Sequence, residues 1–372
     1  MPTPSPSSDR TVLTGVRVFD GNRLTEPTTV VLDGPVVGPI GRDAGDVRAV
    51  DVEGAVLLPG LIDAHVHLHD RDTLERLCSH GVTTALDMAT WPASLLASLR
   101  GVPGVTDIRS AGTPAIGPGG PHARIPGMPD GAVVHTPEDA PRAVADRVAD
   151  GSDYLKIVLE APGDGGPDQA TAGALVAAAH ARGLMVVAHA ATHGAYSVAL
   201  GAGADIVTHV PLGAPLDADE VAGMATSERV CVPTLTMMEG VAIANGVADA
   251  FAGAARSVGA LHRAGVVVLA GTDANTQPGV PAQVAHGESL HHELELLVAA
   301  GLTPAQALRS ATSVTARVFG LADRGAVEPG LRADLVLVDG DPLSDICATR
   351  TIRRIWCGGV EYTPADDRGA AS

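Results

Sequence analysis

Short apolar segments alternate with Gly and Asp turns near both ends of the chain, a pattern that predicts small antiparallel strands. The expected strands are 12–19, 29–32, 36–40, 55–58, 335–338 and 353–356. Because both ends show the same character, we expect them to build one small β-sandwich domain from residues 11–60 plus 321–363. The opening residues 1–10 are rich in Pro and Ser and are expected to form a disordered tail.

Between these ends the pattern changes to an apolar strand, a loop and an amphipathic helix, repeated through residues 61–320. The expected strands are 61–68, 82–88, 105–111, 153–159, 184–189, 204–209, 230–235 and 266–272. Helical stretches include 137–149, 169–182 and 290–300, and Thr136-Pro137 and Thr303-Pro304 have the form of helix starts. Eight strand–helix repeats over about 260 residues predict an α/β fold, the (β/α)8 TIM barrel. An open doubly wound sheet is the alternative, but no Gly-rich phosphate turn follows a strand.

Composition limits the classes of partner. The chain has 372 residues, of which 45% are hydrophobic, enough for one large domain and a small accessory domain. Its net charge of -18 disfavours nucleic acids and anionic membranes, because both select clustered positive charge. No run of about 18 apolar residues occurs, so we expect no membrane span.

Two residue types carry further information. The four cysteines Cys78, Cys231, Cys347 and Cys357 lack metal-type spacing, so we expect core thiols in a reducing, cytoplasmic compartment. All the basic residues except Lys156 are arginine. A single lysine inside an apolar strand suggests a specific chemical role, because only lysine supplies a primary amine that can lose its proton.

Polar residues of the metal-ligand type lie at the ends of the expected barrel strands, where the chemistry of such barrels takes place. They are His65 and His67 on the first strand, Lys156 on the fourth, His189 on the fifth, His209 on the sixth and Asp273 on the eighth. Alternate residues of a strand share a face, so His65 and His67 can chelate one ion. Singly, each residue could be a hydrogen-bonded core histidine or a helix cap. Together they predict a metal centre, because burying the whole set without partners would be costly.

Three segments resemble the amidohydrolase superfamily, which includes urease-like hydrolases, dihydroorotases, dipeptidases and phosphotriesterases. They are 58–67 (LPGLIDAHVH), 271–273 (GTD) and 328–337 (EPGLRADLVL). The resemblance covers nearly the whole chain and implies a ligand set. His65, His67 and Asp273 would bind a more buried ion, His189 and His209 a more exposed one, and Lys156, carboxylated by CO2, would bridge both.

The resemblance also implies a reaction. Hydroxide bridging the two ions would attack an amide (C–N) bond of a small molecule, and Asp273 would pass the proton to the leaving group. Zinc suits the mixed ligands, as do manganese, cobalt and iron. The apolar neighbours of Lys156 should lower its pKa and favour the neutral amine that reacts with CO2.

The substrate is less defined. Segments 154–157 (YLKI) and 290–297 (LHHELELL) are similar to dipeptidases that cut Xaa-Pro or Xaa-Arg/Lys and to imidazolonepropionase-like proteins. Loop 117–124 (GPGGPHAR) lies where those proteins carry a Gly-Gly-His pocket loop, which makes His122 and Arg124 candidate substrate contacts, with Trp91 as a third. A hydrolase of N-acyl amino acids or cyclic amides is the other expectation. In the late helix, His286 could approach the pocket, whereas His291, His292 and Glu295 are expected on a solvated face.

Other functions stay open. A lactonase or phosphotriesterase would use the same ligands. A deaminase with one metal would need a Glu beside the fifth-strand histidine, and Lys156 and the absence of a matching His-x-x-Glu argue against it. A non-catalytic scaffold relative would lack ligands, whereas every expected ligand position is filled here. Dimers or higher assemblies are common in the superfamily, so a homo-oligomer is expected alongside a small-molecule substrate.

Overall fold

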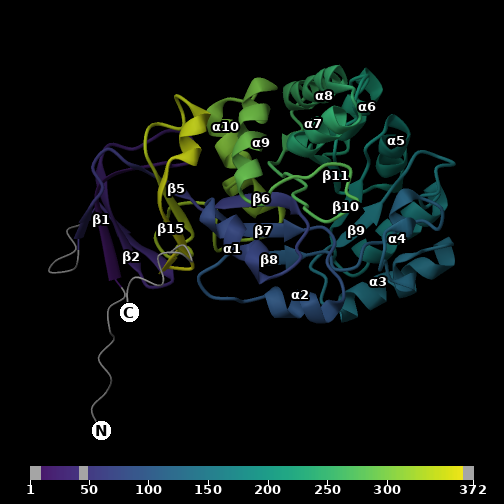
Figure 1. Cartoon of the computed structure of the whole chain (residues 1–372), viewed down its shortest axis with the longest axis horizontal. Coiled ribbons are helices and arrows are strands. Elements are labelled where there is room, and N and C mark those ends of the chain that lie inside the picture. Colours follow the sequence, from purple (N-terminus) through teal and green to yellow (C-terminus); the bar gives the residue numbers. More distant parts are fainter. Residues whose placement is uncertain (1–9, 42–48, 363–372) are drawn as a thin grey trace, which may run out of the picture.

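The computed structural model describes residues 10–41 and 49–362 of the chain. Most of the predicted tail, residues 1–9, lies outside this range, whereas its last residue, Arg10, begins strand β1. Figure 1 shows a strand-rich part at one end, in purple and yellow, beside a larger part whose strands are surrounded by helices. None of the helices in the described ranges is long and apolar enough to cross a bilayer.

Strands from both ends of the chain form one small sheet. They are β1 (Arg10–Val18), β2 (Thr28–Asp33), β3 (Val36–Ile40), β4 (Ala49–Asp51), β5 (Val56–Pro59), β14 (Leu335–Val338), β15 (Ile352–Cys357) and β16 (Val360–Glu361). Their hydrogen-bonded order is β16-β15-β14-β5-β1-β2-β3, with β4 paired to β1. Leu13, Leu57, Leu335 and Trp356 share a core of this sheet's own. The strands thus pair as one connected path, and the predicted sandwich is not confirmed; the boundaries 11–60 plus 321–363 stay predictions.

Eight parallel strands form the larger part, at the predicted places. They are β6 (Leu61–Val66), β7 (Val82–Asp87), β8 (Asp107–Ser110), β9 (Leu155–Val158), β10 (Val186–His189), β11 (Ile206–Thr208), β12 (Val230–Val232) and β13 (Val267–Val268). They pair in two runs, β6-β7-β8 and β9 to β13. Ala115 N donates to Lys156 O (2.8 Å) at one seam, and Asp273 N donates to His65 O (2.8 Å) at the other. These seams close the ring, which confirms the TIM-barrel fold and excludes the open doubly wound sheet.

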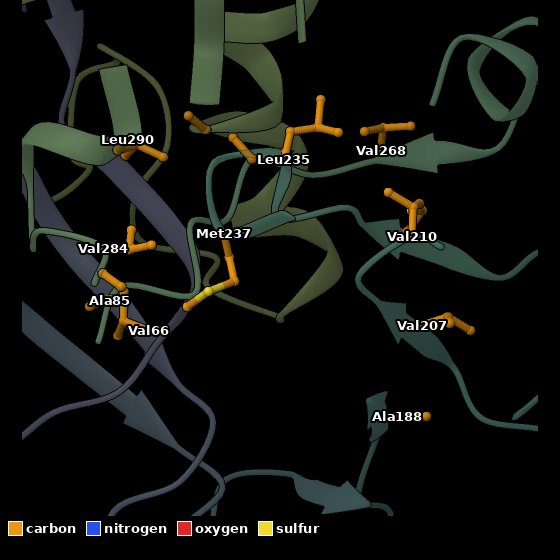
Figure 2. Close-up of a cluster of buried hydrophobic side chains, with 14 of the residues drawn as sticks. Val66, Ala85, Ala188, Val207, Val210, Leu235, Met237, Val268, Val284 and Leu290 are labelled. Atoms are coloured by element: carbon orange, nitrogen blue, oxygen red, sulfur yellow. The ribbon is translucent and has the colours of Figure 1, made fainter. Parts of the chain in front are cut away.

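Helices cover the outside of the barrel (Figure 1). They are α1 (Arg71–Ser79), α2 (Ala93–Leu99), α3 (Ala140–Ala149), α4 (Gln169–His180), α5 (His193–Ala202), α6 (Ala218–Thr226), α7 (Leu235–Ala244), α8 (Phe251–Arg263), α9 (Glu288–Ala299), α10 (Pro304–Ser310) and α11 (Ser313–Val318). Thr303 caps α10 by accepting from Gln306 N, as its Thr-Pro start predicts. Figure 2 shows part of the apolar layer between strands and helices, including Ala188, Val207 and Met237.

The interior of the barrel is apolar at one end and polar at the other. Tyr154, Val187, Ile206 and Val232 lie in an apolar cluster that also contains Ala316 and Leu321, in and just after α11. Two residues further along the same strands, toward their C-terminal ends, come Lys156, His189, Thr208 and Thr234. Because alternate residues of a strand share a face, this second layer faces the same interior. The barrel interior is therefore polar toward the C-terminal ends of its strands and apolar toward their N-terminal ends.

Candidate metal centre

Three predicted ligands lie together where β6 meets the chain after β13. The donor atoms of His65, His67 and Asp273 lie within 4.8 Å of one another. Asp273 Oδ1 is 2.9 Å from His67 Nε2 and 3.3 Å from His65 Nε2. The group predicted for the more buried ion is thus assembled by the fold.

The other three predicted ligands adjoin this group. The His209 ring centroid lies 5.1 Å from that of His65 and 4.4 Å from that of His189, and His209 Nδ1 is 3.9 Å from Asp273 Oδ2. Lys156 is buried, and its Nζ donates to Thr208 Oγ1 at 3.1 Å. All six residues predicted from the strand ends therefore meet at one place.

Burial keeps most of these histidines neutral. It lowers the pKa of His65 to about 3 and the pKa values of His189 and His209 well below the ordinary value. Burial also acts to lower the pKa of His67, but the hydrogen bond with Asp273 reverses this, so that pKa is raised. Neutral imidazole is the form that binds metal, so the site is biased toward ligation.

The pKa values of Lys156 and Asp273 are both lowered, which favours a neutral amine beside an ionised carboxylate. Burial lowers the pKa of Lys156 to about 7, although the charges of Asp273 and Asp87 act in the opposite direction. For Asp273, burial acts to raise the pKa, but His65 and His67 outweigh it, so the pKa lies well below its usual value. A neutral amine and an ionised carboxylate can therefore coexist near neutral pH.

One buried nitrogen tests whether a metal suits this site. His209 Nε2 is buried without a hydrogen-bond partner. An unpartnered buried polar atom is costly, and a cation could satisfy it. Imidazole and carboxylate donors together suit zinc, manganese, cobalt or iron. The residues present thus fit a divalent metal centre.

Two acidic residues that support the ligands were not singled out from the sequence. Asp63 accepts from His65 N (3.1 Å), Thr272 N (3.0 Å) and Thr272 Oγ1 (2.7 Å), and burial raises its pKa to about 7. It therefore ties β6 to the residue preceding Asp273. Asp87 accepts from Leu68 N (3.1 Å) as well as from hydroxyl groups, and it ends β7. The strand-end argument that found the histidines could have found Asp87 too.

The backbone is unusual at three positions of this site. His209, Thr234 and Asp273 have φ values of 75°, 49° and 58°, in the left-handed region that non-glycine residues rarely adopt. Such conformations cost on the order of 1–3 kcal/mol each and persist only where the surroundings enforce them. All three lie at the C-terminal ends of barrel strands.

The candidate substrate contacts differ in where they lie. The His122 ring is 5.0 Å from the His189 ring, and His122 Nδ1 is 3.4 Å from Glu160 Oε1. The exposed Arg124 donates to Gly119 O (3.2 Å), and Trp91 Nε1 donates to Gly127 O (2.8 Å). His122 thus adjoins the candidate ligands, whereas the hydrogen bonds of Arg124 and Trp91 hold the loops together.

Helix α9 corrects one expectation. His286, just before it, reaches the site as expected, with Nε2 2.7 Å from the carbonyl oxygen of His67. His291, predicted on a solvated face, is buried between His80 O and Thr349 Oγ1, each at 3.0 Å. That prediction is wrong because α9 packs against the turn Ile346–Arg350, far along the chain.

The cysteines also differ from the prediction at one position. All four are free thiols, and Cys78, Cys231 and Cys357 are buried. Cys347 is exposed on the turn Ile346–Arg350, so the expectation of a core thiol is wrong there.

Comparisons with known proteins agree with this geometry. The sequence profile of the amidohydrolase family matches residues 56–363. An adenine deaminase of Methylobacterium sp. (strain 4-46) is 27% identical over 97% of this chain and 59% of its own length. The chain thus spans about three fifths of the deaminases it matches. An uncharacterised protein of Mycobacterium tuberculosis is 30% identical over 78% of this chain and 80% of its own.

Solved structures show the same fold. A Xaa-Pro dipeptidase with bound methionine superposes with a TM-score of 0.82 at 24% identity, covering 95% of this chain and all of the other. A molinate hydrolase superposes with a TM-score of 0.77 at 20% identity, covering 95% of each chain. From the profile match over most of its length, the chain belongs to the amidohydrolase family.

Proposed function

We propose that the chain hydrolyses an amide C–N bond of a small molecule at a centre of two divalent ions. His65, His67 and Asp273 would hold one ion, and His189 and His209 the other. The family supports hydrolysis, and the names of its relatives, a Xaa-Pro dipeptidase and an adenine deaminase, both describe reactions at C–N bonds.

The observation that carries the proposal is the environment of Lys156. It is the only lysine of the chain, it is buried beside the candidate ligands, and its pKa is lowered to about 7. A neutral amine can attack CO2 and release a proton, which gives an anionic carbamate. This carbamate would be an anionic oxygen ligand that helps to hold the ions, whereas an ammonium group at the same buried position would be costly and could bind no cation.

Two further tasks, proton transfer and substrate contact, would fall to residues of the chain. The bound ions would supply Lewis acidity, which acidifies water and polarises the scissile group. Asp273 would accept the proton of the attacking water and give it to the leaving nitrogen. Its carboxylate lies within 3.3 Å of His65 and His67, which would hold one ion, so it would stand beside the attacking water. His122, beside His189, would contact the substrate carbonyl or carboxylate.

Replacing the lysine tests the proposal. Lys156→Ala should abolish hydrolysis and lose at least one ion by elemental analysis, and short carboxylic acids should partly restore both. The substrate screen should contain dipeptides, N-acyl amino acids, cyclic amides, lactones and phosphotriesters. Full activity in Lys156→Ala would contradict the role of Lys156 in holding the ions.

Deamination is a second candidate, favoured by the adenine deaminase relatives aligned along 97% of this chain. It would release ammonia from an amino-substituted ring by hydrolysis of a different C–N bond. Ammonia release from adenine, with no cleavage in the amide screen, would establish it. One bound ion per active chain would point the same way.

A further inference from the structure

Helix α7 begins without a cap from its own first residue. Thr234 occupies the N-cap position, where a threonine hydroxyl ordinarily accepts from the second or third N–H of the helix. Here its side chain makes no such bond. Its Oγ1 lies instead 2.8 Å from Nδ1 of His209. The hydroxyl of Thr234 is therefore hydrogen-bonded to His209, a candidate metal ligand.

A carboxylate from another helix replaces the missing cap. Glu293, fully buried within α9, accepts from Leu235 N at 3.0 Å and from Thr236 N at 2.7 Å. It also accepts from Thr236 Oγ1 at 2.8 Å. Negative charge is favourable at a helix N-terminus, and the bonds compensate part of the cost of burial. Glu293 thus satisfies donors that Thr234 leaves free.

This arrangement holds Thr234 in an unusual conformation. Its φ of 49° is unfavourable for a β-branched residue, so its neighbours must enforce it. The residues that follow are fixed by Glu293, and Val232, two residues before, packs inside the barrel. The residues before and after Thr234 are therefore both held in place, which fixes the direction of its hydroxyl.

The geometry points to a positioning relay: we propose that Glu293 caps α7 in place of Thr234, which leaves the Thr234 hydroxyl to accept from the Nδ1–H of His209. His209 would then keep its free lone pair on Nε2, the atom that is buried and unpartnered. A hydrogen bond to one imidazole nitrogen orients the ring and fixes which nitrogen can ligate. The relay rests on the proposed function, in which His209 binds the more exposed ion.

Zinc binding tests the relay without a substrate. Affinities and stoichiometry would be measured by competition with a chromophoric chelator for the wild type, Thr234→Val, Thr234→Ser and Glu293→Gln. Thr234→Val and Glu293→Gln should lower the affinity for one of the two zinc ions about ten-fold and leave the affinity for the other unchanged. Thr234→Ser keeps the hydroxyl and should bind as the wild type does. The absorption spectrum of bound Co2+ should shift in the same two variants.

Glu239→Gln is the matched control. Glu239 also joins α7 to α9, through His292 Nε2 at 2.7 Å, but it has no link to Thr234. Leu235 and Met237 of α7 share the apolar core with Leu290 of α9 (Figure 2), so the helices should stay packed in every variant. The control should leave both zinc affinities unchanged.

Several results would contradict the relay in different ways. Unchanged affinities in Thr234→Val and Glu293→Gln, with two ions in the wild type, would overturn the relay alone. An equal loss of zinc affinity in Glu239→Gln would show that the effect comes from general packing of α7 against α9 and not from the relay. If Glu293→Gln does not fold, Thr234→Val and Thr234→Ser test the relay on their own: equal zinc affinities in these two variants would contradict it. A wild type that binds one ion would contradict the two-ion centre itself, and the relay with it.

Discussion

Arg324 joins the barrel to the segment that leads into β14, and replacing it should destabilise the whole chain. Its Nη1 lies 2.8 Å from Asp107 Oδ2 of β8, 2.9 Å from Thr84 Oγ1 of β7 and 3.8 Å from Asp334 Oδ2. The side chains of Arg324 and Asp334 are each only 3% exposed. Arg324→Met keeps much of the length and removes the charge.

The size of the effect follows from what the substitution leaves behind. Removing one partner of a buried ion pair costs about 3–5 kcal/mol. Asp334 would retain Arg332 Nε at 2.8 Å, and Asp107 would retain the half-buried Arg109 at 3.3 Å. We therefore expect about 3 kcal/mol, the lower end of that range. At roughly 2.1 cal/mol/K of unfolding entropy per residue, this lowers Tm by about 4 °C.

Urea unfolding followed by circular dichroism measures the loss directly. Arg317→Met, at an exposed position of the nearby α11, is the control and should change stability by less than about 0.5 kcal/mol. A loss below about 1 kcal/mol in Arg324→Met, or one equal to the control, would refute the argument from buried charge.

Three further predictions concern the site and its surroundings. Because the pKa of Lys156 is lowered from 10.5 to about 7, its amine is protonated below and neutral above that pH. Bicarbonate-dependent zinc uptake by the apoprotein should therefore rise through about pH 7, and a midpoint near pH 10 would contradict this. Of the four free thiols, the exposed Cys347 should be the one that an aromatic disulfide reagent labels rapidly in the native chain, with four labelled after unfolding; rapid native labelling of all four would contradict the burial. Gly165→Ala should lower kcat/KM and Tm together, because its φ is 89° and a Cβ would lie 2.2 Å from the Gly119 carbonyl carbon; unchanged values would show that the two loops can separate freely.

Local pattern was enough to predict the barrel and to single out six strand-end residues that lie near one another; that they bind metal stays a prediction. The eight strands lie where apolar runs predict them, and His65 and His67 meet Asp273 because the strand ends of a closed barrel face one mouth. Strand pairing depends on distant segments, so the single path through β5, β1 and β2 could not be distinguished from a sandwich.

The supporting residues were harder to predict than the ligands. Glu293 resembles any acidic residue of an amphipathic helix, because the N–H groups that it binds lie 57 and 58 residues earlier in the chain. His291 was misplaced for the same reason, since its partners belong to a turn and a helix end far away in the sequence. Asp63 was visible within the first-strand motif, but only the structure shows that it binds Thr272.

The pairing of β5 with β14 has a consequence for how the chain matures on the ribosome. β5 ends at Pro59, and its antiparallel partner β14 begins at Leu335, so the partner strand is synthesised long after the first. At about 5–20 residues per second, this interval is on the order of tens of seconds. During that time the apolar edge of β5 has no partner and is open to chaperones or to other nascent chains. The small sheet should therefore be the last part to form during synthesis.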